Sequence, residues 1–293
     1  GAGEAAAEGP TVVVTTNILG DVVENLVGDE LDVVTVMPVG ADPHDFQASA
    51  QQVAAIGDAA VMIVNGAGFE EGLLDVIESA QDDGVPVFEA ISAVSTVEFG
   101  EGDEHGDEEH EDDHDDADPH FFSDPARMAL AADAIASFLI DAVEGIDAEA
   151  LRSNADAYIV ELEALDAEVA ETLEGLSEDQ RVLVTNHEVF GYFADRYDFE
   201  IVGTVIPGGA TVDGASAQAL AELAETIEDE GVPAIFADTS SSDQLAQTLA
   251  DEVGEIDVVE LFSESLGDED SEGATYLQMV RTNADRIAVA LGA

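Results

Sequence analysis

Short apolar runs alternate with longer mixed segments along the first hundred residues. The apolar runs are rich in Val and Ile, are bounded by Gly, Pro or Asn, and occupy residues 11–17, 31–37, 59–65 and 85–90. Runs of this length and composition predict buried parallel strands. The pattern between them predicts helices around residues 19–27, 48–57 and 70–82. This alternation predicts a parallel sheet with helices on both faces.

The same alternation restarts in the second half of the chain. Further strands are predicted at residues 181–186, 199–205, 232–238 and 257–262, with helices between them and a last helix near 272–291. TVMPVGAD at 35–42 resembles TVIPGGAT at 204–211, and the Thr-Asn pair that ends the first strand recurs after RVLV with the same offset. We interpret these matches as an internal repeat of two similar lobes.

Two helices are predicted between the repeats, over about 126–143 and 147–175. Asp124 followed by Pro125 is a typical helix start, because Asp caps a helix and Pro fits its first position. The second helix contains no Pro and ends at Gly175. At 1.5 Å per residue it would be about 40 Å long, which is enough to run the height of a domain.

These patterns predict an α/β protein with two (β/α) lobes, whose parallel sheets are joined by a long rigid linking helix. The expected division is a flexible N-terminal linker, an N-terminal lobe, connecting helices and a C-terminal lobe, at residues 1–10, 11–125, 126–178 and 179–293. Within the first lobe, residues 98–118 form a low-complexity acidic tract that contains His105, His110 and His114. Such a composition cannot bury a core, so we expect a mobile loop.

The charge of the chain is extreme, with 68 Asp and Glu against 6 Arg and no Lys, for a formal net charge of -62. Nucleic-acid binding needs a basic face, and docking on anionic lipid does too, so neither is expected. Carboxylates occur on almost every predicted helix. We interpret this as adaptation to very high salt, where at about 1 M the Debye length is only about 3 Å.

The chain contains no Cys, which excludes disulfides and thiolate metal sites. No apolar run approaches the roughly 18 residues of a membrane span. The start, GAGEAAAEGP, is small and polar, and we interpret it as the beginning of a processed, mature chain. We expect an extracellular, cell-surface location with an anchor in the membrane through the processed N-terminus.

Three of the six His lie outside the acidic tract: His44, His120 and His187. His44 and His187 follow predicted strands, and His120 precedes the capped helix. Ligands of open parallel sheets gather beyond the carboxyl ends of strands, and imidazole is the commonest metal-binding side chain. The placement favours a metal site, although a single His is more often structural.

Four motifs, in this order, resemble those of the ABC-transporter solute-binding proteins for zinc and manganese (cluster A-I). They are DPHDFQAS, ADPHFFSDP, TNHEVFGYFADRY and LFSESL followed by GATYLQMVRTNADRIAVAL. The resemblance covers about residues 11–291. It implies one metal ion in the cleft between the lobes, bound by His44, His120, His187 and Glu264.

The fourth ligand departs from the family pattern, which more often has Asp at this position. Glu is one methylene longer, so its reach toward the metal is open. Glu260, Asp238 and Asp213 are nearby in sequence and are alternative ligands, or carboxylates that orient the ligands. The acidic tract resembles the metal-rich loop of the zinc branch, which implies weak cation collection by His105, His110 and His114; a solvated insertion is the alternative.

The function expected from the resemblance is capture of a divalent metal and its delivery to an ABC-transporter permease, by a monomer that is not an enzyme. Three imidazoles and one carboxylate favour zinc over manganese, which is the alternative cargo. A zinc hydrolase, a binding protein for an organic solute and a cell-surface metal buffer remain as other classes.

The net charge generates a prediction about salt. Lowering the salt concentration removes the screening between carboxylates, so the metal-free protein should unfold or expand. Thermal melting at about 0.05 M and about 3 M KCl checks this, and we expect a much higher midpoint in 3 M KCl. Equal midpoints would contradict adaptation to high salt.

Overall fold

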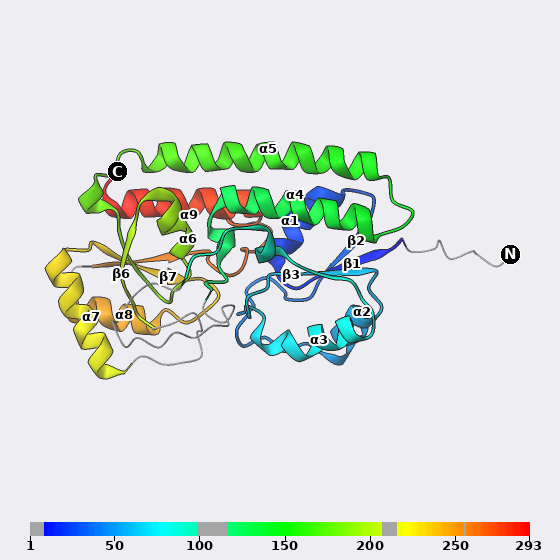
Figure 1. Cartoon of the computed structure of the whole chain (residues 1–293). Helices are drawn as coiled ribbons and strands as arrows, with labels where there is room; N and C mark the ends of the chain where they lie inside the picture. Colours follow the sequence, from blue (N-terminus) through cyan, green and yellow to red (C-terminus); the bar gives the residue numbers. More distant parts are fainter. Residues whose placement is uncertain (1–8, 99–116, 207–215, 255) are drawn as a thin grey trace, which may run out of the picture.

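The computed structural model describes residues 9–98, 117–206, 216–254 and 256–293. The chain forms two α/β lobes beside each other, and one long helix runs across both of them (Figure 1). His105, His110 and His114 lie outside the described residues, as does Asp213. None of the helices in the described ranges combines the length and apolarity needed to cross a bilayer.

The N-terminal lobe contains a parallel sheet of four strands in the order β2-β1-β3-β4. The strands are β1 (Thr11–Val14), β2 (Asp32–Thr35), β3 (Val61–Val64) and β4 (Val87–Glu89). The helices are α1 (Asn17–Val27), α2 (Ala50–Gly57) and α3 (Leu74–Asp82), with 3₁₀ turns η1 (Glu71–Leu73) and η2 (Ala90–Ala93). The fourth strand is shorter than predicted, because the chain turns into η2 at Ala90.

The C-terminal lobe repeats this arrangement, with the order β6-β5-β7-β8. Its strands are β5 (Val182–Thr185), β6 (Glu200–Thr204), β7 (Ala234–Asp238) and β8 (Asp257–Leu261). Its helices are η4 (Glu178–Gln180), α6 (Gly191–Tyr197), α7 (Ala217–Glu230), α8 (Gln244–Val253) and α9 (Tyr276–Leu291). The matching strand orders agree with the internal repeat. The last helix begins later than predicted, because Thr275 caps it by accepting from the N–H of Gln278.

Three helical elements connect the lobes: η3 (Phe121–Ser123), α4 (Pro125–Ala142) and α5 (Ala148–Leu173). Asp124 caps α4 by accepting from the N–H of Ala126. Helix α5 is the long linking helix and lies over α4 and α9 (Figure 1). Its buried positions, spaced three or four residues apart, form one apolar stripe: Leu151, Ala155, Tyr158, Leu162, Leu165, Val169 and Leu173.

The apolar core beneath α5 is shared by both lobes. One continuous cluster of buried side chains includes Val14 from β1, Leu26 from α1, Leu162 from α5, Phe236 from β7 and Ile287 from α9. Each lobe has a further core on the outer face of its sheet. Burial of one such side chain contributes about 1.5–3 kcal/mol. The shared cluster therefore holds the two sheets in a defined relation to each other.

The few cations of this acidic chain join separate elements. Arg196 of α6 pairs with Asp166, and Arg281 of α9 pairs with Glu168, so both bind side chains of α5. Exposed pairs of this kind contribute about 0–1 kcal/mol. Arg181 is different, because its guanidinium donates to the backbone carbonyls of Leu173, Leu176 and Tyr197.

Replacing Arg181 should therefore destabilise the fold more than replacing an exposed Arg. Arg181→Met leaves carbonyl groups at the end of α5 without their charged donor, and we expect a loss of about 2 kcal/mol in the free energy of unfolding. Chemical denaturation at high salt measures it. The control is Arg152→Met, which removes an exposed pair with Asp133 and should cost less than about 1 kcal/mol. Equal losses would contradict the special role of Arg181.

Candidate metal centre

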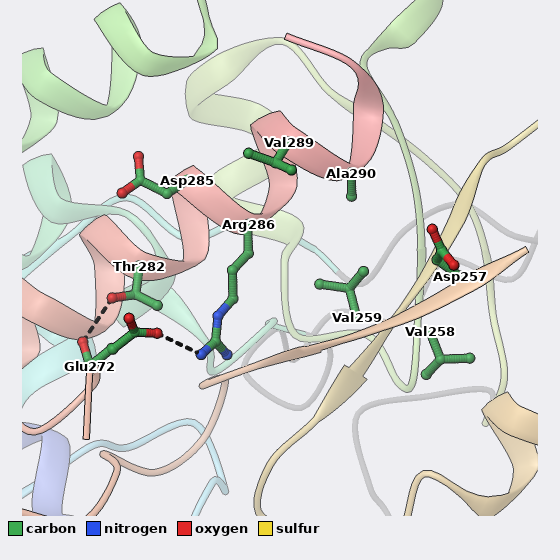
Figure 2. Close-up of a pocket in the computed structure, with 9 residues that line it drawn as sticks. All are labelled: Asp257, Val258, Val259, Glu272, Thr282, Asp285, Arg286, Val289 and Ala290. Carbon is green, nitrogen blue, oxygen red and sulfur yellow. Dashed lines mark hydrogen bonds and ion pairs between the residues drawn. The ribbon is translucent and has the colours of Figure 1, made fainter. Parts of the chain in front are cut away.

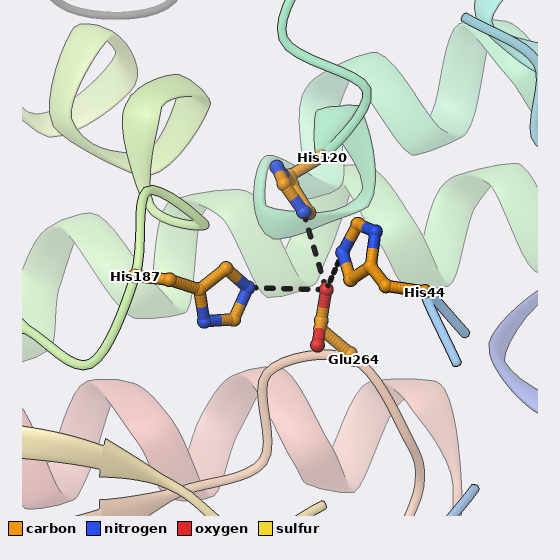
Figure 3. A group of neighbouring side chains, drawn as sticks. All are labelled: His44, His120, His187 and Glu264. Carbon is orange, nitrogen blue, oxygen red and sulfur yellow. Dashed lines mark hydrogen bonds and ion pairs between the residues drawn. The ribbon is translucent and has the colours of Figure 1, made fainter. Parts of the chain in front are cut away.

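Three imidazoles converge on one carboxylate oxygen between the lobes (Figure 3). Glu264 Oε1 lies 2.7 Å from His44 Nε2, 3.1 Å from His187 Nε2 and 3.3 Å from His120 Nε2. The four side chains offer ligand atoms that all lie within 4.8 Å of one another, and all four residues are buried. The residues predicted as ligands are thus brought together by the fold.

His44 lies in the loop between β2 and α2. Its backbone N–H donates to the Asp42 carboxylate at 2.9 Å, which shapes the turn. The ring uses both nitrogens: Nε2 faces Glu264, and Nδ1 lies 3.2 Å from Glu71 Oε1. Glu71 is the first residue of η1, and its side chain is partly exposed. A carboxylate on the second nitrogen fixes the orientation of a metal-binding imidazole.

His120 lies directly before η3, at the entrance to α4. Asp118 Oδ1 accepts from the His120 backbone N–H at 2.9 Å and lies 2.7 Å from its Nδ1. The Pro119 carbonyl, between these two residues, accepts from the side-chain amide of Asn65. Asn65 follows β3, so the His120 segment is bound to the end of the N-terminal sheet. The Nε2 atom is directed at Glu264 as a result.

His187 follows β5 after one intervening residue. The hydroxyl of Thr185 donates to the His187 carbonyl at 2.7 Å, which forms a tight turn at the end of the strand. This turn points the ring into the space between the lobes (Figure 3). The Nδ1 atom is buried and has no hydrogen-bond partner among the described residues. The three imidazoles therefore differ in how their outer nitrogens are held.

Glu264 lies in the loop between β8 and α9, and its side chain is inaccessible to solvent. Burial by itself would raise the pKa of this carboxyl group, but His187, His120 and His44 hold the pKa well below its usual range. Its second oxygen, Oε2, is buried without a hydrogen-bond partner among the described residues. A buried carboxylate with a free oxygen requires positive charge beside it.

The charge on the imidazoles follows from the same contacts. Burial lowers the pKa of His120, but Asp118 and Glu264 outweigh burial and raise the pKa to about 9. Burial also lowers the pKa of His44, and the carboxylate of Glu264 reverses this effect, so that its pKa is raised. Both shifts favour the protonated form of these imidazoles beside the Glu264 carboxylate.

Aromatic rings cover the site on one side. Phe69 packs edge-on against His44 and His120, with ring centroids 5.4 and 5.5 Å apart. Phe122 contacts His120 in the same way at 5.9 Å. These rings exclude water, which strengthens the electrostatic interactions inside the site.

Two of the three alternative carboxylates, Asp238 and Glu260, belong to the described residues. Asp238, at the end of β7, is buried and binds the N–H and hydroxyl of Ser240. Glu260 is exposed on β8, and its carbonyl accepts from Arg286. Neither belongs to the group around His44. The extra methylene of Glu264 does not prevent its carboxylate from reaching all three rings.

Sequence reasoning did not identify Asp118 and Glu71 as partners of the ligands. The signal for Asp118 was present in DPH, where an Asp two residues before a His can accept from its backbone and its ring. The same spacing occurs in DPHDF, where Asp42 accepts from the backbone N–H of His44, while Glu71 lies against the Nδ1 atom of the ring. Only the folded chain brings η1 to His44.

A surface hollow lies away from this centre. It has a volume of about 590 Å³ and lies between β8 and α9 (Figure 2). Its cation, Arg286, is already bound by Glu272 at 3.2 Å and by the Glu260 carbonyl. No imidazole lines it. The hollow therefore lacks the ligands that a transition metal prefers, and the buried group remains the candidate site.

Comparison with known proteins identifies the family. The family model for the periplasmic zinc-uptake complex component A (ZnuA) matches residues 12–290. The chain belongs to the ZnuA family. The resemblance noted in the four motifs is thereby confirmed over nearly the whole chain.

Individual relatives of this ZnuA-family chain are described as binding different metals. The zinc-binding protein TroA of Treponema pallidum is 31% identical over 99% of this chain and 92% of its own length. Its solved structure covers 97% of this chain and 100% of its own, with a TM-score of 0.84 at 29% identity. The manganese-binding lipoprotein MntA of Halalkalibacterium halodurans is 27% identical over 95% of this chain and 87% of its own length.

A third relative is described as a substrate-binding lipoprotein of a metal ABC transporter: SsaB of Streptococcus sanguinis, 26% identical over 96% of this chain and 88% of its own length. The ZnuA family consists of such binding proteins and not of enzymes. The predicted class of function, capture of a divalent metal for an ABC transporter, is confirmed at this level. The comparisons do not distinguish zinc from manganese.

The Asp118–His120 pair generates a prediction about pH. Since the pKa of His120 in the folded protein, about 9, is above the unfolded value of about 6.5, this pair stabilises the metal-free protein fully below about pH 6.5. The contribution is lost as pH rises through about 9. In Asp118→Asn the pKa of His120 should fall toward 6.5, and metal affinity should fall about 10- to 100-fold.

Nuclear magnetic resonance titration of the His120 ring in the metal-free protein measures the pKa. The matched control is Asp124→Asn, a buried carboxylate four residues beyond His120 that caps α4, a role that Asn can also fill. The control should leave the His120 titration in place. An unchanged His120 pKa in Asp118→Asn would disprove the assigned pairing.

Proposed function

We propose that His44, His120, His187 and Glu264 bind one zinc ion as cargo, which the protein delivers to an ABC-transporter permease. The observation that carries this proposal is the group of four buried ligand atoms within 4.8 Å of one another. Tetrahedral zinc with bonds of about 2.1 Å places its ligands about 3.4 Å apart. The distances from Glu264 Oε1 to the three imidazole nitrogens, 2.7–3.3 Å, are slightly shorter, so a small outward shift of this oxygen would admit the ion. The free Oε2 of Glu264 supports a cation at this point.

Four protein ligands favour transport over catalysis. A catalytic zinc ion usually keeps one position open for water, whereas a closed set of four holds the ion without activating a water molecule. All four residues are at most 6% exposed. Among the described residues they therefore offer almost no surface that a substrate could contact. This agrees with membership of a family of binding proteins.

The choice of metal rests on the donor atoms. Three imidazole nitrogens with one carboxylate suit zinc, and nitrogen ligands bind zinc more strongly than manganese. Manganese prefers oxygen-rich sites, which would need a second carboxylate. The manganese-binding relative MntA makes manganese the competing cargo.

Proton release should accompany binding, because the imidazoles must be neutral to bind a metal. The raised pKa values of His120 and His44 mean that protons already compete near neutral pH. Affinity should therefore rise with pH up to about 9, and acidification should release the metal. The number of protons released on metal binding is therefore a second measurement of the same site.

We infer a location at the cell surface or in the periplasm from the relatives described as lipoproteins or as periplasmic. The His residues of the acidic tract would supply weak cation collection near the cleft. The tight site does not need them, because His120 and its cap lie beyond the tract. The chain is expected to act as a monomer with no nucleic-acid partner.

The test is titration of the metal-free protein at high salt with zinc, followed by competition with manganese. We expect one zinc per chain, a preference for zinc of at least tenfold, and release of about one proton per zinc near pH 7.5. His187→Ala should lower zinc affinity at least 100-fold, because it removes a ligand from a dry site.

The matched control is His110→Ala, which removes a His of the acidic tract and should leave the tight site unchanged. If His187→Ala still bound one zinc per chain with undiminished affinity, the ligand assignment would be wrong. A preference for manganese would overturn zinc as the cargo while leaving the four ligands in place.

A further inference from the structure

The loop that carries Glu264 is bound to the opposite lobe through the next residue, Ser265. Its hydroxyl lies 3.1 Å from the side-chain amide nitrogen of Asn17, the first residue of α1. The side-chain amide oxygen of Asn17, Oδ1, accepts from the backbone N–H of Leu266 at 2.7 Å. Asn17 and Ser265 are buried, and they are 248 positions apart in the chain.

The same two side chains also hold the loop that leads to His44. Ser265 Oγ accepts from the backbone N–H of Gly40 at 2.7 Å. Asn17 Nδ2 donates to the carbonyl of Pro38 at 3.1 Å. The Pro38–Gly40 backbone and the Ser265–Leu266 backbone are therefore joined through one amide and one hydroxyl. His44 lies four residues after Gly40, and Glu264 directly precedes Ser265.

We propose that Asn17 and Ser265 are positioning residues that hold Glu264 against His44 and thereby set the rate at which bound metal leaves. This inference rests on the proposed function. The four ligand residues are at most 6% exposed, and His44, at 6%, is the most exposed of them. Because the ligands are buried, metal can leave only if a segment that carries a ligand moves. The two loops joined by Asn17 and Ser265 carry His44 and Glu264.

The other side of the site is held differently. The Tyr192 hydroxyl donates to the Asp118 carbonyl at 2.6 Å, and the Tyr276 hydroxyl donates to the Phe122 carbonyl at 2.8 Å. Both Tyr residues are on helices of the C-terminal lobe and are fully packed in the shared core. The His120 segment is thus held by side chains from two helices of the opposite lobe, whereas the His44 segment contacts the opposite lobe through the hydroxyl of Ser265, a loop residue. The two loops can therefore separate by breaking hydrogen bonds between them, without withdrawing a core side chain.

The experiment compares Ser265→Ala with Ser263→Ala. Both serines flank Glu264 directly and are nearly fully buried. Ser263 lies beside Asp238 of its own lobe, and in the described ranges it makes no hydrogen bond to the N-terminal lobe. The two variants lose the same atom at the same distance from the ligand. They differ in whether the lost contact joins the lobes.

The release rate of zinc into excess chelator is measured at high salt, together with chemical denaturation of the metal-free variants. We expect release about tenfold faster in Ser265→Ala, and within twofold of the parent protein in Ser263→Ala. A tenfold change corresponds to about 1.4 kcal/mol, which is within the net contribution of one or two hydrogen bonds. Both variants should unfold at similar denaturant concentrations when metal-free.

Asn17→Leu supplies the second variant, because Leu has nearly the same volume and no polar atoms. The double variant with Ser265→Ala should show less than the combined effect of the two single variants, since each of them already removes the Asn17–Ser265 hydrogen bond. Additive rates, or equal release from Ser265→Ala and Ser263→Ala, would overturn the inference. A parent protein that binds no zinc or manganese would instead refute the proposed function.

Discussion

The placement of one buried carboxylate among three imidazoles governs this structure. Glu264 is withdrawn from water, and burial of an unpaired carboxylate costs several kcal/mol. Its charge is tolerated because His44, His120 and His187 reach the same oxygen from three directions. Protons can satisfy this arrangement, and so can a metal ion. Competition between the two is the basis of the proposed dependence of metal binding on pH.

Such convergence requires a scaffold that places distant chain segments at one point. The four candidate ligands follow β2, β5 and β8 or precede α4, so both sheets must direct these ends at each other. The shared core beneath α5 supplies the fixed relation between the sheets. The acidic surface contributes repulsion instead of support, and Arg152, Arg196 and Arg281 form ion pairs that join α5 to its neighbours.

The two halves of the site combine rigidity with a means of release. Tyr192 and Tyr276 bind the backbone around His120 from helices in the core. The loops of His44 and Glu264 meet through Asn17 and Ser265. A protein that binds and delivers a metal ion needs both properties, because it must select the ion by fixed geometry and later release it. Hydrogen bonds between loops can be broken without disturbing the core.

The sequence by itself determined the elements and the choice of candidate ligands. Val-rich runs and the cap at Asp124 indicated strands and the start of α4, and His residues at strand ends indicated a metal site. These signals are local, because strand and helix periodicity and capping depend on neighbours in the chain. The four motifs then distinguished His44, His120, His187 and Glu264 through resemblance to a family.

The tertiary structure decided what depends on contacts between distant residues. Residues 260 and 264 are both Glu, but Glu260 is exposed on β8, whereas Glu264 lies beyond the end of the strand and its side chain is buried. Glu71 meets His44 only because η1 folds back over the loop. Asn17 meets Ser265 across 248 positions. No local pattern encodes such pairs, because side-chain packing in three dimensions brings them within hydrogen-bonding distance.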